Sequence, residues 1–303
     1  MLENGLIFAR FLHYAAVMAL FGGALFPLYA YPSRADPEPA RLSIWLRPIL
    51  CALALAAFVS AVLWLSLVTA SMAGSTSAAT DPDALQSVLA ETLFGQVWAM
   101  RLALSGLLVG LTVLSYVAPS NRSNRAAATA LLAAALLATL AGTGHTMHSE
   151  GISRDIHIAS DAVHLLAAGA WFGGLIALGY VLRTATPDTK AVLHRFSGMG
   201  YAAVAALVGS GLINGWFLVG SFVNLFAQPY GQLLLVKIML FAAMLSLALA
   251  NRFWLMPALS REPSQAVVAE TRLRRHVSVE LAIGVLVIMI VSLLGTLEPA
   301  VGH

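Results

Sequence analysis

The chain has 303 residues, of which 59% are hydrophobic and only 10% are charged, and its mean hydropathy is +0.84. This composition excludes a soluble globular domain and predicts a polytopic membrane protein. The net charge of +3 is small and follows from loop arginines, so a nucleic-acid partner is not indicated. The single cysteine, Cys51, excludes an intramolecular disulfide framework and a cysteine-ligated metal cluster.

Eight apolar segments are each long enough for the roughly 20 residues that a helix needs to cross the hydrocarbon core. We expect all of them to be helical, because a lipid-exposed backbone must satisfy its own hydrogen bonds. The fold predicted for residues 1–303 is therefore all-α, a single domain formed by a bundle of eight transmembrane helices. The predicted spans lie near 6–30, 45–70, 95–118, 126–144, 157–182, 196–220, 230–256 and 277–297. The first span is expected to be retained, since Glu3 and Arg10 do not suit a signal peptide.

Lysine and arginine alternate between the predicted loops in a way that orients the chain. The loop 71–94 and the loop 221–229 have no such residue, and 145–156 has only Arg154. These are the even-numbered loops, counted from the N-terminus. The odd-numbered loops are basic and hold Arg34, Arg41, Arg47, Arg122, Arg125, Arg183, Lys190, Arg195, Arg252, Arg261, Arg272, Arg274 and Arg275. Positive residues accumulate on the cytoplasmic side, so both termini and the even-numbered loops are predicted to lie outside, which in a Gram-negative cell is the periplasm.

The stretch 142–174 carries four of the eight histidines of the chain. His145 and His148 flank Met147 in the predicted fourth loop, at the outer mouth of the bundle. His157 and His164 follow on the fifth span, with Asp161 between them. The spacing i, i+4, i+7 from His157 to His164 places these three side chains on one face of a helix.

Three ionisable residues on three different spans are expected at a similar depth. His13 lies seven residues into the first span, roughly 10 Å from its outer end at 1.5 Å per residue. His164 and Lys237 occupy comparable positions in the fifth and seventh spans. Such residues are costly in lipid and usually face a bundle interior or a watery cavity.

Imidazole and thioether side chains together indicate a metal. Imidazole suits copper, zinc and iron, whereas the thioether of Met147 favours Cu(I). Neutral ring nitrogens also bind a metal near physiological pH without releasing protons from every ligand. The candidate metal ligands are His13, His145, Met147, His148, His157 and His164.

The supporting residues each have a functional and a structural interpretation. Asp161 either ligates the metal or orients His157 or His164 as a hydrogen-bond acceptor. Lys237 balances an electron-rich site or reaches the outer interface. The candidate cavity residues are Asn214 and Trp171.

Small residues and one carboxylate complete the predictions. Trp171 and the glycines beside it, Gly169, Gly173 and Gly174, indicate close helix packing, and the run 198–215 suggests a tightly packed sixth helix. Glu280 begins the last span on the cytoplasmic side. A structural helix-end pair with a nearby basic residue is the favoured interpretation of Glu280, and an exit-side metal or proton role is the second.

An ordered series of segments gives the chain a resemblance that covers nearly its full length. The segments are FLHYAAVMALFGG, GTGHTMHSEG, DAVHLLAAGAWFGGL, RFSGMGYAAVAALVGSGLING, YGQLLLVKIML, LANRFWLMPAL and VSVELAIGVLV. With them the chain resembles the CopD (PcoD-like) family of bacterial copper-resistance inner-membrane proteins. The resemblance implies an eight-helix protein that handles copper, moving it from periplasm to cytoplasm. It also implies a periplasmic partner of the CopC type, which would be a separate polypeptide here.

Three function hypotheses stand at this point. The first is a copper permease with His13 and His164 as a membrane-embedded relay. The second is an electron carrier in which two histidines ligate haem b, and the third is a copper-binding or docking module that transports nothing. No nucleotide loop, Gly-x-Ser-x-Gly elbow or HExxH motif is found, so we expect no enzyme activity and no ATP-driven pumping by this chain alone. Oligomeric state, direction of transport and coupling ion stay open.

Overall fold

The computed structural model describes residues 2–32, 40–118, 122–143, 151–184 and 188–300. Within these ranges eight helices are long and apolar enough to cross a membrane, which confirms the predicted all-α architecture. They comprise α1 (Leu2–Ala30), α2 (Ala40–Ala73), α4 (Leu93–Val117), α5 (Arg122–Ala138), α6 (Gly151–Thr184), α7 (Thr189–Val219), α9 (Pro229–Ala250) and α11 (Pro263–Leu294).

Short helices lie between the long ones. They are η1 (Thr76–Ala79), α3 (Pro82–Glu91), η2 (Thr139–Thr143), α8 (Phe222–Ala227), the π-helix η4 (Asn251–Leu255) and α10 (Met256–Ala258). The local sequence explains where two helices, α3 and α4, begin. The Asp81 carboxylate accepts a hydrogen bond from the backbone N–H of Asp83 at 3.1 Å where α3 begins, and Thr92 Oγ1 accepts one from Gly95 N–H at 2.8 Å where α4 begins.

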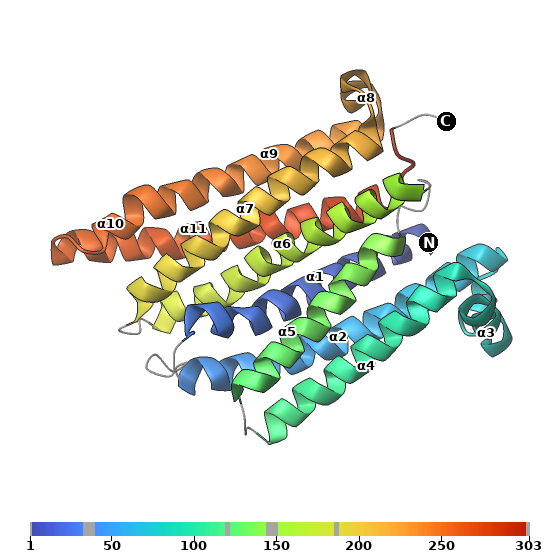
Figure 1. The fold of residues 1–303 in the computed structure, drawn as a ribbon, viewed down its shortest axis with the longest axis horizontal. Coiled ribbons are helices and arrows are strands. Elements are labelled where there is room, and N and C mark those ends of the chain that lie inside the picture. The colour runs from blue at the N-terminus through green and yellow to red at the C-terminus, as the bar shows by residue number, and fades with distance from the viewer. Residues whose placement is uncertain (1, 33–39, 119–121, 144–150, 185–187, 301–303) are drawn as a thin grey trace.

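Helices α1 and α6 form the centre of the bundle (Figure 1). Helices α2 and α5 pack against α1, with α4 beyond them, while α7 and α11 pack against α6, with α9 beyond α11. In both α1 and α6, 67% of the most apolar 18-residue stretch is buried, against 6% for α9. Polar residues on α1 and α6 are therefore shielded from lipid by the surrounding helices.

Glycines bring α1 and α6 into close contact. A Cβ atom added to Gly173 would lie 2.6 Å from Gly22 Cα and 2.8 Å from the Ala19 carbonyl oxygen, and both of these are backbone atoms that cannot move aside cheaply. A Cβ on Gly169 or Gly174 would likewise crowd side chains on neighbouring elements, at 2.9 Å. These contacts confirm the close packing predicted from the glycines beside Trp171.

The tight packing predicted for the run 198–215 is wrong for most of its glycines. A Cβ atom on Gly198, Gly200, Gly209 or Gly215 would meet no atom within 4 Å among the described residues. Helix α7 lies at the edge of the bundle, where small residues face outward. A small-residue run is therefore compatible with close packing but does not require it.

The last helix differs from its predicted span. Helix α11 begins at Pro263 rather than near 277, and it ends at Leu294 rather than near 297. Its first turns are polar, and there Arg274 forms an ion pair with Glu270 one turn earlier. Hydropathy locates the part of a helix that suits lipid, whereas the helix itself continues past that part.

Both ends of the described chain lie at one end of the bundle, as Figure 1 shows. The same end carries α3 and α8, which belong to the loops that have few basic residues. The opposite end carries the turn between α10 and α11. This arrangement agrees with an alternation of eight spans, while the side of the membrane on which each end lies stays a prediction.

Candidate functional site

His13 lies in the N-terminal half of α1 and has no exposed surface. Its Nδ1 atom is 3.1 Å from the Ala57 carbonyl oxygen and 3.0 Å from Ser60 Oγ, both on α2. A carbonyl oxygen can only accept, so Nδ1 carries the proton and Nε2 keeps its lone pair. Nε2 is buried and has no hydrogen-bond partner among the described residues. This is the arrangement of a histidine that is held through one nitrogen and can ligate a metal through the other.

Two indole rings enclose the imidazole. The ring centroid of His13 is 5.9 Å from that of Trp64 on α2 and 6.5 Å from that of Trp98 on α4. Two guanidinium groups lie over these indoles: Arg101 is 4.2 Å from the Trp98 centroid, and Arg10 is 5.3 Å from the Trp64 centroid. The surroundings of His13 are thus aromatic and cationic.

Arg101 is a buried residue that the sequence reasoning missed. It has no exposed surface, its Nε donates to Thr139 Oγ1 at 3.1 Å, and its Nη2 donates to the Thr139 carbonyl oxygen at 2.9 Å. It therefore connects α4 to η2. The signal was present, because an arginine inside the apolar segment 95–118 is by default a functional or structural residue.

The polar face of α6 is directed toward α7, as its spacing predicts. The buried His157 ring stacks on Phe217, with centroids 4.7 Å apart and planes 11° from parallel. One turn further on, the Asp161 carboxylate accepts a hydrogen bond from Asn214 Nδ2 at 3.3 Å. Asn214 Oδ1 is itself buried and has no partner in the described part of the chain.

His164 is held in the same manner as His13. Its Nδ1 atom lies 3.0 Å from Ser210 Oγ on α7, and that hydroxyl donates to the Ala206 carbonyl oxygen at 2.5 Å. Because the hydroxyl proton is already used, Ser210 accepts from Nδ1–H and His164 Nε2 keeps its lone pair. Ser210, and not Asp161, is therefore the residue that orients this ring.

Lys237 lies within α9, a helix that packs against α11. Its two interpretations, balance of an electron-rich site and reach to the outer interface, both stay predictions.

The predicted ligand set stays a prediction. In the described ranges no group of three His, Cys, Asp or Glu side chains could hold a metal ion. His13 and His164 are each bonded through Nδ1 to a different helix, α2 and α7 respectively. His145, Met147 and His148 lie outside the described residues, so their relation to the buried histidines is untested.

Comparison with known proteins decides the family. The family described as "Copper resistance protein D-like, N-terminal domain" matches residues 1–155, and that described as "Copper resistance protein D" matches residues 190–294. The chain is 35% identical to copper resistance protein D of Pseudomonas syringae pv. tomato over 305 aligned positions, covering 97% of this chain and 96% of the relative. This chain belongs to the copper resistance protein D family.

Two further relatives extend the comparison. The inner membrane protein YebZ of Escherichia coli K12 is 32% identical over 297 positions, covering 96% of this chain and 97% of the relative. The copper transport protein CutJ of Bacillus subtilis is 30% identical over 315 positions, which span 99% of this chain but 54% of the relative. No solved structure matches the chain. As a member of the copper resistance protein D family, the chain is a copper-handling multi-pass membrane protein.

A second buried polar cluster of this family member lies toward the opposite end of the bundle. Glu280 on α11 is 1% exposed, and its Oε1 accepts a hydrogen bond from Asn251 Nδ2 at 2.8 Å. Asn251 Oδ1 is in turn 2.7 Å from His276 Nδ1. The partner of Glu280 is therefore an amide at the start of the π-helix, whereas Arg274 pairs with Glu270. A π-helix inside an α-helical span frequently marks a functional position.

Trp171 and His13 are both surrounded by packed side chains. Trp171 is 3% exposed and packs edge-to-face on Phe241 of α9, with ring centroids 6.0 Å apart. Its position favours a core residue. His13 has no exposed surface, and two indoles lie against its ring. The described surroundings of His13 therefore give the haem alternative no support.

Proposed function

We propose that the chain is a copper permease, in which the imidazoles of the buried His13 and the half-buried His164 pass copper through the outer half of the bundle. The observation that carries the proposal is the Nε2 atom of His13. A buried ring nitrogen without a hydrogen-bond partner costs about 1–3 kcal/mol, and such an atom calls for a functional explanation. A soft metal ion as passing substrate supplies the missing partner.

The proposal assigns different roles to the outer loop and to the buried rings. His145, Met147 and His148 accept Cu(I) at the outer mouth, His157 follows, and His164 and His13 form the buried step. Ser60 and Ser210 hold the two rings with Nε2 free. A separate periplasmic carrier of the CopC type would deliver the metal to the mouth.

Glu280 belongs to the inner half of this proposed path. Glu280 is buried, and its carboxylate is linked through Asn251 to His276. Among the described residues it is the buried acidic group that the proposed exit would use. We assign it to the release of copper or of a coupled proton. The competing interpretation is a purely structural contact between α11 and the π-helix.

Uptake of Cu(I) into proteoliposomes under reducing conditions tests the permease. His13→Ala and His164→Ala should each reduce the initial rate about tenfold or more, as loss of a metal ligand or its support does elsewhere. The double variant should lose no more than either single one, because ligands that act as a unit are not additive. Thr112→Val is the matched control, since this buried hydroxyl bonds to carbonyls of its own helix.

Glu280→Gln is tested in the same assay. It should slow uptake without reducing the amount of copper bound at the outer sites.

Three results would contradict the proposal. Unchanged uptake in both histidine variants would exclude the buried relay. Copper retained by the purified protein without any uptake into vesicles would identify a binding or docking module. Stoichiometric haem with a Soret band, lost in His13→Ala, would identify an electron carrier.

A further inference from the structure

A pocket of about 450 Å³ opens between the start of α7 and the end of the α9–η4–α10 segment. This volume is within the range of small-ligand sites. It lies far along the bundle from His13, at the end that carries the arginine-rich loops. Its lining residues are Lys190, Leu193, His194, Arg252, Phe253, Met256, Pro257, Leu259 and Ser260.

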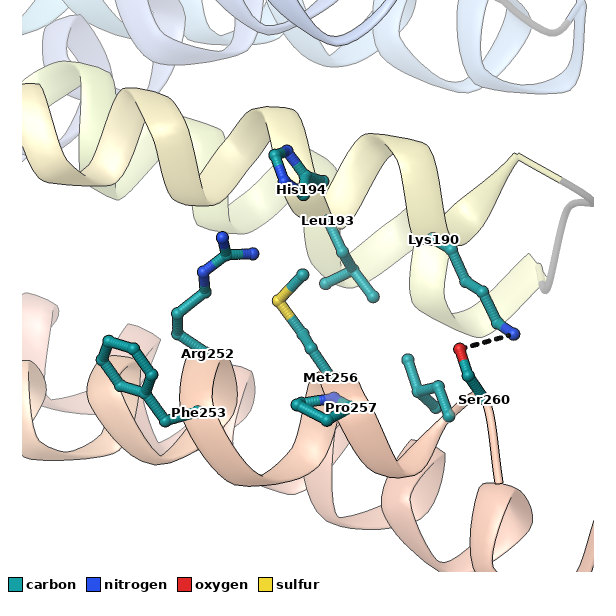
Figure 2. Close-up of a pocket in the computed structure, with 9 residues that line it drawn as sticks. Lys190, Leu193, His194, Arg252, Phe253, Met256, Pro257 and Ser260 are labelled. Atoms are coloured by element: carbon teal, nitrogen blue, oxygen red, sulfur yellow. Dashed lines mark hydrogen bonds between the residues drawn. The ribbon is translucent and has the colours of Figure 1, made fainter. Parts of the chain in front are cut away.

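Basic side chains from both walls of the pocket face the same space. Figure 2 shows the Arg252 guanidinium extending from the π-helix toward α7, where His194 and Lys190 lie. Lys190 Nζ donates to Ser260 Oγ at 3.3 Å across the pocket. No aspartate or glutamate is among the lining residues, and the ion pair between Glu270 and Arg274 in the described part of the chain does not involve them. The cations are thus not neutralised by the pocket itself.

The remaining surface of the pocket is apolar and opens beside lipid-facing aromatics. Leu193 and Met256 form its floor, and Phe253, which is 59% exposed, forms part of its rim. The next residue, Trp254, is 73% exposed. Exposed aromatic residues at the end of a transmembrane helix typically lie at the level of the lipid headgroups.

Two neighbouring residues of the π-helix contact different parts of the bundle. Asn251 donates to Glu280 on α11, while Arg252 lines the pocket facing α7. Neighbouring side chains leave a helix in different directions, about 100° apart in an α-helix, so the same turn reaches both α11 and the pocket.

We propose that this pocket binds the phosphate of an anionic phospholipid in the cytoplasmic leaflet. Arg252 provides a planar fork that matches two phosphate oxygens, and Lys190 provides a second charge from the other wall. Basic pockets between transmembrane helices on the cytoplasmic side are suited to anionic headgroups. The apolar floor and the exposed aromatic rim favour a lipid over a free phosphate ion, because acyl chains would cover Phe253. This site is independent of the copper path.

Native mass spectrometry of the detergent-purified full chain tests the site, with phosphatidylglycerol and zwitterionic phosphatidylcholine supplied together. The wild-type chain should retain phosphatidylglycerol preferentially. Arg252→Gln and Lys190→Gln should each reduce that preference about fivefold, the value of one lipid-proximal cation. Arg261→Gln removes an exposed arginine that does not line the pocket and should leave the preference unchanged.

The two variants lie on different helices, so a folding defect in one leaves the other informative. Equal retention of the two lipids by the wild-type chain would overturn the proposal, as would equal losses in Arg252→Gln and Arg261→Gln. Inorganic phosphate at millimolar concentration is the third probe. Displacement of phosphatidylglycerol by phosphate alone would assign the pocket to a soluble anion and overturn the lipid as its occupant.

Discussion

At the scale of single residues, the buried part of the candidate site is defined by what each ring nitrogen contacts. His13 and His164 are both held through Nδ1 by a serine whose own proton is donated to a helix carbonyl. The histidines are readily selected from the sequence, because ionisable residues inside apolar spans stand out. Ser60 and Ser210 are not, since a serine in an apolar helix usually bonds only to its own helix.

Arg101→Met should lower the stability of the purified protein. The substitution removes the donors to Thr139 Oγ1 and to the Thr139 carbonyl oxygen. A hydrogen bond to a charged group contributes about 1.5–3 kcal/mol to the free energy of unfolding. We expect a loss of about 2 kcal/mol, measured as a lower midpoint of thermal unfolding. The exposed Arg261→Met serves as control. An unchanged midpoint in Arg101→Met would show that this buried contact contributes little.

At the scale of elements, the α1–α6 crossing positions the site. Gly22 and Gly173 allow the two helices to approach until their backbones touch, and this approach brings the first and second halves of the chain together. His13 projects from one of these helices and His164 from the other. A glycine motif in the sequence indicates that close packing is possible, yet only the structure distinguishes the buried Gly173 from the open Gly209.

Gly173→Ala and Gly209→Ala form a matched pair. The first places a Cβ 2.6 Å from a backbone atom of α1, and overpacking of this kind costs about 1–3 kcal/mol. The second adds a methyl group where no described atom lies within 4 Å, and replacing a helical glycine by alanine is favourable by up to about 1 kcal/mol. Thermal unfolding of both variants should therefore shift in opposite directions. Shifts in the same direction would contradict the crossing geometry.

At the scale of the whole molecule, the orientation of the bundle gives direction to both proposals. One end of the bundle carries both ends of the described chain and the short helices α3 and α8. Lys190 and Arg252 line their pocket at the opposite end. The charge alternation predicts that the first end lies outside and the second inside. The proposed copper path then runs from the histidine-rich mouth to Glu280, and the proposed lipid site lies in the inner leaflet.

Cysteine labelling tests this orientation directly, because Cys51 is the single native cysteine. In a Cys51→Ser background, Ser75→Cys places a thiol at the exposed start of η1, and Ser264→Cys places one at the exposed start of α11. A membrane-impermeant maleimide should label the first variant in intact spheroplasts and the second only after lysis. The reverse pattern would invert the topology and move the lipid site to the outer leaflet.

The sequence by itself determined the membrane class, the eight helices and several ionisable residues within the spans that are worth testing. It could do so because each span must satisfy its backbone hydrogen bonds alone and must be apolar over a fixed length, and both are local properties. Only the tertiary structure decided that Ser60 and Ser210 hold the imidazoles, that Arg101 lies in the core, and that Asn251 rather than an arginine contacts Glu280. These contacts join residues 29 to 47 positions apart through helix packing, which no local pattern encodes.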